Sequence, residues 1–189
     1  MSNEQKIAVF LDLQGTLGGD ARGSIMDFSF YPGAIEAIKK INKHQLLAII
    51  ITNQAHIAMG YFTFKEYEAR LDELKQELSK EGAYLSAVYC CPHLSDECSC
   101  RKPLPGMIEK ALQEFNINIS DSYVVGDSGT ADMLLARKVG AKGILVRSGS
   151  GQRSLTISRH KWADYEPDYI AENILNAVDW ILNNSAVKD

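Results

Sequence analysis

The 189-residue sequence lacks the features of a nucleic-acid-binding, secreted or membrane protein. Its formal net charge is −4 and it has no basic field, so nothing in it favours a phosphate backbone as a partner. No apolar run reaches the roughly 18 residues that a membrane span needs. The first residues, MSNEQK, have neither the basic nor the apolar part of a signal peptide. We therefore expect a cytoplasmic protein with no nucleic-acid or membrane partner.

Internal repeats, low-complexity tracts and linkers are also absent from the sequence. A chain of this length with 46% hydrophobic residues can bury one sizeable core. We therefore expect residues 1–189 to form a single domain. Nothing in the sequence demands assembly, so a monomer or a weak homodimer is expected.

Apolar runs alternate with helical patterns along the chain, which is typical of βα units around a mainly parallel sheet. The expected strands are residues 7–11, 46–51, 84–89, 123–125 and 143–146. The expected helices are residues 33–43, 63–82, a helix opened by Pro105, 131–139 and 172–182. The polar segment 147–166 is expected to be irregular surface. The predicted fold class is α/β.

Polar side chains stand at the ends of three expected strands. They are Asp12 in FLDLQGT, Thr52 with Asn53 in IIITNQ, and Asp127 in VVGDSGTAD. Ligands of open α/β sheets bind beyond the carboxyl ends of the strands. The two carboxylates suit a divalent cation, which would neutralise the charge of a phosphate. Taken singly, each residue has a structural alternative as a turn former or a helix cap.

A fixed positive charge, Lys102, follows in the stretch RKPLPG. A phosphate site built from carboxylates and a threonine still needs a cation from the protein, and Lys102 can supply it. The alternative is that Arg101 and Lys102 are solvated surface charges.

Three cysteines and one histidine form the pattern CxHxxxxCxC within ten residues. They are Cys91, His93, Cys98 and Cys100. Zinc favours four such ligands in a tetrahedron, and a site with four protein ligands is structural because no position is left for water. We expect a zinc-binding loop at about residues 90–101. The alternative is a set of buried or free thiols, and Cys90 shows that not every cysteine here is needed as a ligand.

In order and context, these motifs resemble those of the haloacid dehalogenase-like (HAD) phosphatases. The matching stretches are DLQGT, ITNQ, CRKPLPG and GDSGTAD, and the resemblance runs from about residue 6 to residue 183. The cysteine loop is similar to that of subfamily IIIA, in the branch of heptose bisphosphate and histidinol-phosphate phosphatases. The resemblance implies a Rossmann-like sheet flanked by helices, a zinc loop and no large cap domain.

The resemblance also implies a role for each polar residue. Asp12 would be the nucleophile that forms an aspartyl-phosphate. Thr52 would hold a phosphoryl oxygen, and Lys102 would offset charge between nucleophile and phosphate. Asn53 and Arg101 would lie close to the substrate.

Two metals are implied as cofactors. Catalytic Mg²⁺ would be bound by Asp12, the backbone carbonyl of Gln14 and Asp127, with Asp132 orienting Lys102 or the water around the metal. Structural Zn²⁺ would be bound by the cysteine loop.

Gln14 departs from the family pattern, because the family usually has an Asp at this position that gives and takes a proton. A carboxamide cannot exchange a proton usefully at neutral pH. General acid–base assistance typically contributes about 10² to 10⁴ in rate, so an ordinary ester phosphatase would be impaired by that order. The substrate could instead be an acyl phosphate with a good leaving group, another group such as His56 could replace the acid, or the protein could bind phosphorylated ligands without turnover.

A second departure lies in NQAHIAMGYF, where His56 and Met59 stand in place of a glycine and an arginine of the heptose phosphate branch. Losing a cation weakens the case for a substrate with a second phosphate. His56 is equally explained as a surface loop residue. The sequence thus predicts a magnesium-dependent phosphatase acting on a small phosphorylated metabolite, such as a sugar phosphate. The alternative is a slow or silent homologue that binds such a metabolite.

Overall fold

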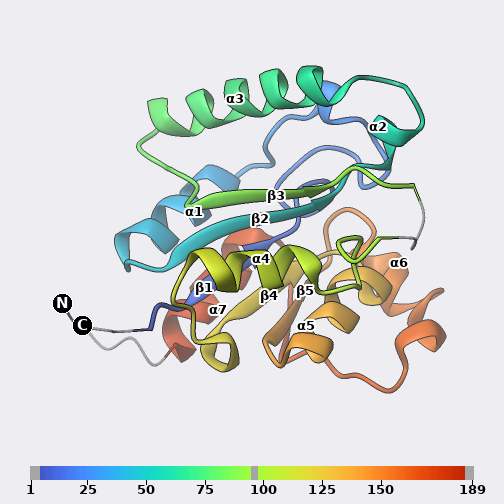
Figure 1. Cartoon of the computed structure of the whole chain (residues 1–189). Helices are drawn as coiled ribbons and strands as arrows, with labels where there is room; N and C mark the ends of the chain where they lie inside the picture. Colours follow the sequence, from blue (N-terminus) through green and yellow to red (C-terminus); the bar gives the residue numbers. More distant parts are fainter. Residues whose placement is uncertain (1–4, 95–97, 186–189) are drawn as a thin grey trace.

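The computed structural model describes residues 5–94 and 98–185, and its centre is a six-stranded sheet in the order β3-β2-β1-β4-β5-β6 (Figure 1). Every neighbouring pair of strands is parallel. The strands are β1 (Ala8–Leu11), β2 (Leu47–Asn53), β3 (Ala87–Cys91), β4 (Tyr123–Gly126), β5 (Lys142–Val146) and β6 (Tyr169–Ala171). This confirms the α/β class with a mainly parallel sheet.

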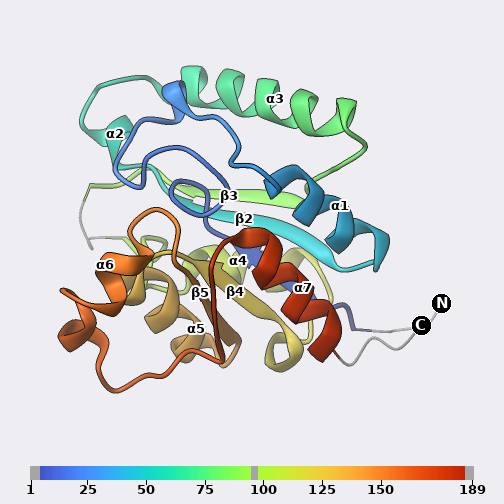
Figure 2. The ribbon, with the colours of Figure 1, turned by 180° about the vertical axis from the view of Figure 1, so that it is seen from behind.

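Helices cover both faces of the sheet. They are α1 (Ala34–Lys43), α2 (Ala55–Ala58), α3 (Phe64–Lys80), α4 (Gly106–Glu114), α5 (Leu134–Val139), α6 (Gly151–Leu155) and α7 (Ile174–Asn184). Short 3₁₀ turns are η1 (Ile25–Asp27), η2 (Ile119–Asp121) and η4 (Arg159–Trp162), and η3 (Gly129–Met133) is a π-helical turn. Helices α1, α3 and α7 pack on one face, which Figure 2 brings forward, and α4 and α5 pack on the other.

Local sequence explains several features of these elements. All four residues of β1 and of β4 are buried, as expected for strands covered on both faces. Helix α3 begins with a reciprocal pair of hydrogen bonds between Thr63 and Glu66, so two of its free backbone N–H groups are satisfied. Helix α5 ends at Gly140, whose left-handed conformation, φ 75°, favours glycine.

The third strand begins three residues later than expected, at Ala87 instead of Tyr84. Tyr84 is 58% exposed, and both of its backbone polar groups bond to the side chain of Asn42, the N–H to Oδ1 and the carbonyl to Nδ2. Because these groups are already paired outside the sheet, the strand does not extend back to Tyr84.

The prediction that residues 147–166 are irregular surface is wrong. The segment folds into α6 and η4, and Trp162 in η4 is only 2% exposed. Trp162 packs with Met133 and Leu145, and it lies so close to Gly129 that a Cβ there would approach its ring to 2.0 Å. A buried aromatic side chain therefore anchors this polar segment to the sheet.

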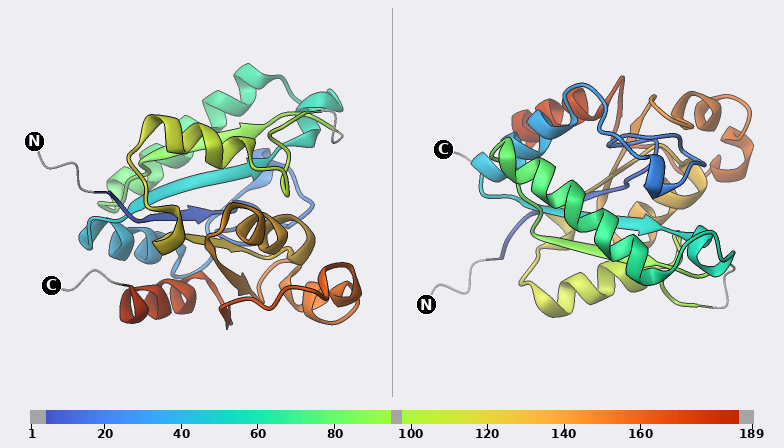
Figure 3. Two further views of the ribbon diagram at one scale, coloured as in Figure 1. Left: turned by 60° about the horizontal axis from the view of Figure 1, so that its bottom comes forward. Right: turned by 90° about the horizontal axis from the view of Figure 1, so that it is seen from above.

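Connections after the strands gather at the carboxyl ends of the sheet, where α2 and the α6–η4 segment lie (Figure 3). The expected zinc loop follows β3 at this end, although its residues 95–97 lie outside the described part of the chain. Among the described residues, no helix is both long enough and apolar enough to cross a membrane.

Candidate active site

The buried ammonium group of Lys102 joins two carboxylates from opposite parts of the site. Its Nζ lies 2.6 Å from Oδ1 of Asp12 and 2.7 Å from Oδ1 of Asp132. Asp12 follows β1, Asp132 lies in η3 after β4, and Lys102 precedes α4. Parallel strands end at the same edge, so residues 90 and 30 positions from Lys102 meet there.

Asp127 and Asp132 are held by backbone N–H groups. Oδ2 of Asp127 accepts a hydrogen bond of 2.6 Å from the N–H of Ser150, and Oδ2 of Asp132 accepts one of 3.0 Å from the N–H of Ser128. Both oxygens of Asp132 are thus occupied, one of them by Lys102. Asp132 is therefore turned toward the lysine.

Two glycines let the backbone close over Asp127. A Cβ on Gly15 would lie 2.2 Å from Oδ2 of Asp127, and one on Gly149 would lie 2.4 Å from the same atom. Both residues have left-handed φ values, 87° and 55°, which L-residues rarely adopt. The hydroxyl of Ser148 also donates to the carbonyl of Gly15 at 2.8 Å. The loops after β1 and β5 therefore touch at this carboxylate.

The pKa values of the buried carboxyl groups are raised, because several negative charges are buried close together. Burial, together with the charges of Asp12 and Asp132, raises the pKa of Asp127 to about 8. Burial raises the pKa of Asp132 to about 6, although Lys102 opposes the change. Burial alone would lower the pKa of Lys102, but the neighbouring charges of Asp12 and Asp132 outweigh it and raise that pKa.

The carboxylates fit a divalent cation. Asp12, Asp127 and Asp132 offer oxygen atoms that all lie within 4.8 Å of one another. Hard oxygen donors suit Mg²⁺, and a cation beside Asp127 would relieve the repulsion that raises its pKa.

The side chain of Gln14 is held by hydrogen bonds at both ends. Its Nε2 donates to the carbonyl of Gly23 at 3.1 Å. Its Oε1 accepts from Nε2 of Gln54 at 2.8 Å and from the hydroxyl of Thr52 at 3.4 Å. The same Nε2 of Gln54 lies 2.9 Å from the Thr52 hydroxyl. Gln14 therefore ties the loop after β1 to the end of β2.

A cavity of about 390 Å³ opens beside Asp12, Lys102 and Asp127. It is also lined by Gln14, Asn53 and Arg101, but Thr52 is not among its lining residues and is only 1% exposed. The cavity has a volume typical of small-molecule sites.

Asn53 and Arg101 support the lysine segment. The Asn53 side chain bonds to the backbone of Lys102 twice, accepting from its N–H at 3.0 Å and donating to its carbonyl at 3.3 Å. Arg101 donates to the carbonyl of His93 at 3.1 Å. Both line the cavity, and both also connect the loop that carries Lys102 to its surroundings.

Three cationic residues that line the cavity have no signal in the sequence that marks them as site residues. They are Arg22, from the loop after β1, and Arg153 and Lys161, from the α6–η4 segment. In sequence they look like ordinary solvated charges, and only the folding of residues 147–166 onto the sheet gives Arg153 and Lys161 their place.

His56, named as a possible replacement acid, is not among the residues that line this cavity. Its ring packs against the rings of Tyr61 and Phe62, with centroids 5.2 and 6.3 Å away. Met59 is 48% exposed and is also outside the cavity lining.

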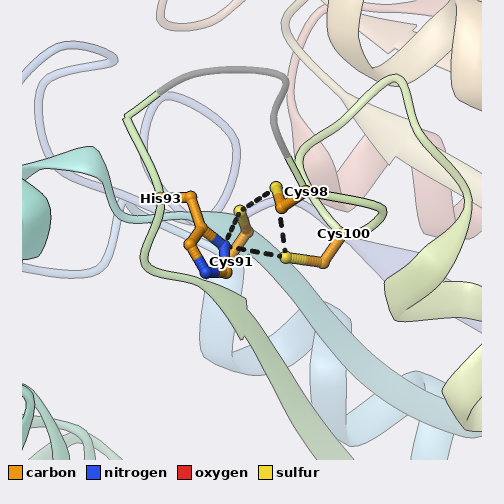
Figure 4. Close-up of side chains that lie close together, drawn as sticks. All are labelled: Cys91, His93, Cys98 and Cys100. Atoms are coloured by element: carbon orange, nitrogen blue, oxygen red, sulfur yellow. Dashed lines mark hydrogen bonds between the residues drawn. The ribbon is translucent and has the colours of Figure 1, made fainter.

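The cysteine loop brings its four expected ligands together (Figure 4). The Sγ atom of Cys98 lies 3.6 Å from that of Cys91 and 3.5 Å from that of Cys100. Nδ1 of His93 lies 3.5 Å from Cys91 Sγ and 3.2 Å from Cys100 Sγ. Zn–S bonds of about 2.3 Å in a tetrahedron place sulfurs about 3.8 Å apart, so the cluster fits a possible zinc site.

Comparison with known proteins identifies the family. A family model described as HAD-hydrolase-like matches residues 99–177. The D-glycero-beta-D-manno-heptose-1,7-bisphosphate 7-phosphatase of Haemophilus ducreyi is 36% identical over 170 residues, which cover 84% of this chain and 91% of that protein. The D-glycero-D-manno-heptose-1,7-bisphosphate 7-phosphatase of Thermosynechococcus vestitus is 34% identical over 193 residues, with 95% and 97% covered. This chain belongs to the HAD-like hydrolase family.

The fold of this chain agrees with that of a solved HAD-like structure. The D,D-heptose 1,7-bisphosphate phosphatase from B. bronchiseptica, complexed with magnesium and phosphate, has a TM-score of 0.83 and 26% identity, and the match covers 96% of this chain and 100% of that one. The predicted family and the Rossmann-like HAD fold are thus confirmed. As a member of this family of phosphatases, the chain is a phosphoric monoester hydrolase.

The two ion pairs of Lys102 with Asp12 and Asp132 predict that Lys102→Met lowers the free energy of unfolding in a pH-dependent way. Without the ammonium, the pKa of buried Asp132 should rise further above its unfolded value, so the ionised carboxylate destabilises the fold increasingly as pH rises. We expect a loss of about 3–5 kcal/mol in unfolding free energy at pH 8, the usual cost of breaking a buried pair, and a smaller loss at pH 5.

Urea unfolding of the original chain and of Lys102→Met at pH 8 and pH 5, without added magnesium, measures the loss in unfolding free energy at each pH. The control is Lys142→Met, because that lysine lies 4.0 Å from Asp121 at the surface and should cost under about 1 kcal/mol. Equal losses for Lys102→Met at both pH values would contradict the expectation.

Proposed function

We propose that the chain hydrolyses a phosphate ester of a small phosphorylated sugar of the heptose bisphosphate kind, with Asp12 as the nucleophile. The observation that carries the proposal is the bridge from Lys102 to Asp12 and Asp132 on the floor of a cavity. A buried ammonium beside a reactive carboxylate can draw a phosphate to that carboxylate and offset the charge of the transition state. The names of the relatives support the sugar phosphate class.

The reaction has two steps. An oxygen of Asp12 attacks phosphorus, and the bond between phosphorus and the ester oxygen breaks, so the sugar leaves with the electron pair and takes up a proton. Water then attacks the aspartyl-phosphate, releases inorganic phosphate and restores the Asp12 carboxylate. Lys102 stays beside Asp12 through both steps, and Asp132 keeps it in position.

Two further groups complete the proposed centre. Asp12, the backbone carbonyl of Gln14 and Asp127 would hold Mg²⁺, which neutralises phosphoryl charge when bound. The Thr52 hydroxyl donates to Gln14 and accepts from Gln54, so it would donate to a phosphoryl oxygen only after releasing its bond to Gln14. We therefore assign Thr52 to support of Gln14 in this state of the site.

Proton transfer to the leaving oxygen should be slow in this site. Gln14 has no titratable proton, and both ends of its carboxamide are already bonded. The leaving oxygen would take its proton from water. Substrates that need little acid assistance should therefore react best.

Zn²⁺ held by Cys91, His93, Cys98 and Cys100 is proposed as a structural cofactor. The loop has little apolar content, and it leads directly into Arg101 and Lys102. The bond from Arg101 to His93 links one of these cations back to the loop. The metal would therefore help to set the position of Lys102.

A second function is favoured by the locked carboxamide of Gln14. A protein without acid–base chemistry can bind a phosphorylated sugar and release it unchanged. The reactive placement of Asp12 beside Lys102 favours hydrolysis over this receptor role.

Phosphate release tests the two functions. The chain and its Asp12→Asn variant would be assayed with Mg²⁺ on heptose 1,7-bisphosphate, histidinol phosphate, simple sugar phosphates and an acyl phosphate. We expect release by the original chain and a loss of at least about 10³-fold in Asp12→Asn, because no carboxylate remains to attack. Asp72→Asn, at an exposed site on α3, is the matched control. Binding of the sugar phosphate without release would support the receptor.

Replacing Gln14 by Asp should restore acid assistance. We expect kcat for a sugar phosphate to rise by about 10²- to 10³-fold, within the range of general acid–base catalysis. Hydrolysis of p-nitrophenyl phosphate, whose leaving group needs no proton, should change much less. Steady-state kinetics on both substrates checks this, and an equal effect on the two would mean that proton transfer is not what Gln14 limits.

Neighbouring cysteines test the zinc proposal. Cys91→Ser should lose bound zinc and activity, because it removes one of four ligands. Cys90→Ser should keep both, since Cys90 is not part of the cluster. Elemental analysis of the purified proteins gives the zinc content. Equal zinc in both variants would contradict the ligand set.

A further inference from the structure

Gln54 is a buried residue next to the candidate active site, and its side chain does not serve its own helix. It is 1% exposed and stands directly before α2, but its side chain makes no hydrogen bond to the first turn of that helix. Its backbone N–H donates to the carbonyl of Cys91 at 2.7 Å, which ties the end of β2 to the end of β3. Gln54 is not among the residues that line the cavity, so any effect on the reaction must pass through its neighbours.

The carboxamide of Gln54 has one possible orientation. The carbonyl of Gly23 can only accept a hydrogen bond, so Gln14 must present Nε2 to Gly23 and Oε1 to Gln54. Gln54 must then present its own Nε2, which donates to Oε1 of Gln14 at 2.8 Å and to the hydroxyl of Thr52 at 2.9 Å. Both N–H groups of this nitrogen are therefore used on residues of the candidate site.

This orientation leaves a buried acceptor unpaired. Oε1 of Gln54 accepts no hydrogen bond from any residue that the structure describes, although the atom is buried. A buried acceptor without a partner lowers stability, and native structures contain few of them. Local departures of this kind are expected at functional sites. The orientation of Gln54 therefore serves the two groups to which it donates.

The hydrogen bond from Gln54 restricts where the proton of Thr52 can point. A hydroxyl has one proton to donate and accepts through its lone pairs. Because Gln54 donates to Oγ1 of Thr52, the hydroxyl proton must be directed to another acceptor. That acceptor is Oε1 of Gln14 at 3.4 Å, beyond the about 2.5–3.0 Å that is usual for such a bond. The proton is thus weakly held, and a phosphoryl oxygen could replace Gln14 as its acceptor.

We propose that Gln54 is a positioning residue that directs the hydroxyl proton of Thr52 toward a phosphoryl oxygen. The inference rests on the proposed function, in which a phosphate group binds beside Asp12. Without the N–H groups of Gln54 the hydroxyl could rotate. A lone pair of Thr52 that faced the phosphate would then repel it.

A double-mutant cycle tests whether Gln54 acts through this hydroxyl. Gln54→Met keeps the length of the side chain and removes its N–H groups, so kcat/KM for heptose 1,7-bisphosphate should fall about tenfold, the size expected for one lost hydrogen bond. In a Thr52→Val background, which has no hydroxyl, the same change should cost less than about threefold. In a Thr52→Ser background, which keeps the hydroxyl, the loss of about tenfold should remain. The control Gln76→Met, at an exposed position on α3, should have no such effect in any background.

Calorimetric binding of inorganic phosphate in the presence of Mg²⁺ repeats the cycle without turnover. The phosphate affinity should follow the same pattern, with a loss of about tenfold in Gln54→Met that depends on the hydroxyl of residue 52. Near-ultraviolet circular dichroism checks that each variant is folded. Gln54→Leu serves as a second apolar variant, so the test does not depend on the folding of one protein.

The two readouts separate this inference from the proposed function. If the original chain releases no phosphate from any ester but its phosphate affinity follows the expected pattern, the proposed hydrolysis fails and the role of Gln54 stands. The role of Gln54 is overturned if Gln54→Met has no effect, or if it costs as much in the Thr52→Val background as in the original chain. Either of these results counts against the positioning role whether or not the chain is a phosphatase.

Discussion

A buried lysine shared by two carboxylates is the constraint on which this structure depends. Lys102 is 5% exposed, and an ammonium so far from water is stable only with charged partners. Its partners come from the ends of β1 and β4, so the lysine requires both strand ends and the loop before α4 to meet at one point. Asn53 fixes the backbone of the same lysine, which brings the end of β2 into the arrangement.

A second polar network holds the carboxamide of Gln14 in the site. Gln14 uses both its donor and its acceptor, with Gly23 on one side and Gln54 on the other. A carboxylate at this position would offer no donor to the Gly23 carbonyl. The carboxamide therefore ties the loop after β1 to the end of β2.

Much of this was accessible from sequence, because the signals were local and strong. Alternating apolar runs predicted the sheet, strand ends predicted the positions of Asp12 and Asp127, and spacing predicted the cysteine cluster. What could not be predicted depends on contacts between distant residues. No local sequence pattern predicts the burial of Trp162, because its burial depends on contacts with Gly129 and Leu145. The start of β3 depends on Asn42, and the partners of Thr52 depend on side-chain orientation.

The contact between Gly15 and Gly149 has a consequence for how this protein can vary. A Cβ on Gly149 would come within 2.4 Å of the Cα of Gly15, so neither loop can accept a larger residue there without moving the other. The two loops that close over Asp127 therefore cannot change independently at these two positions.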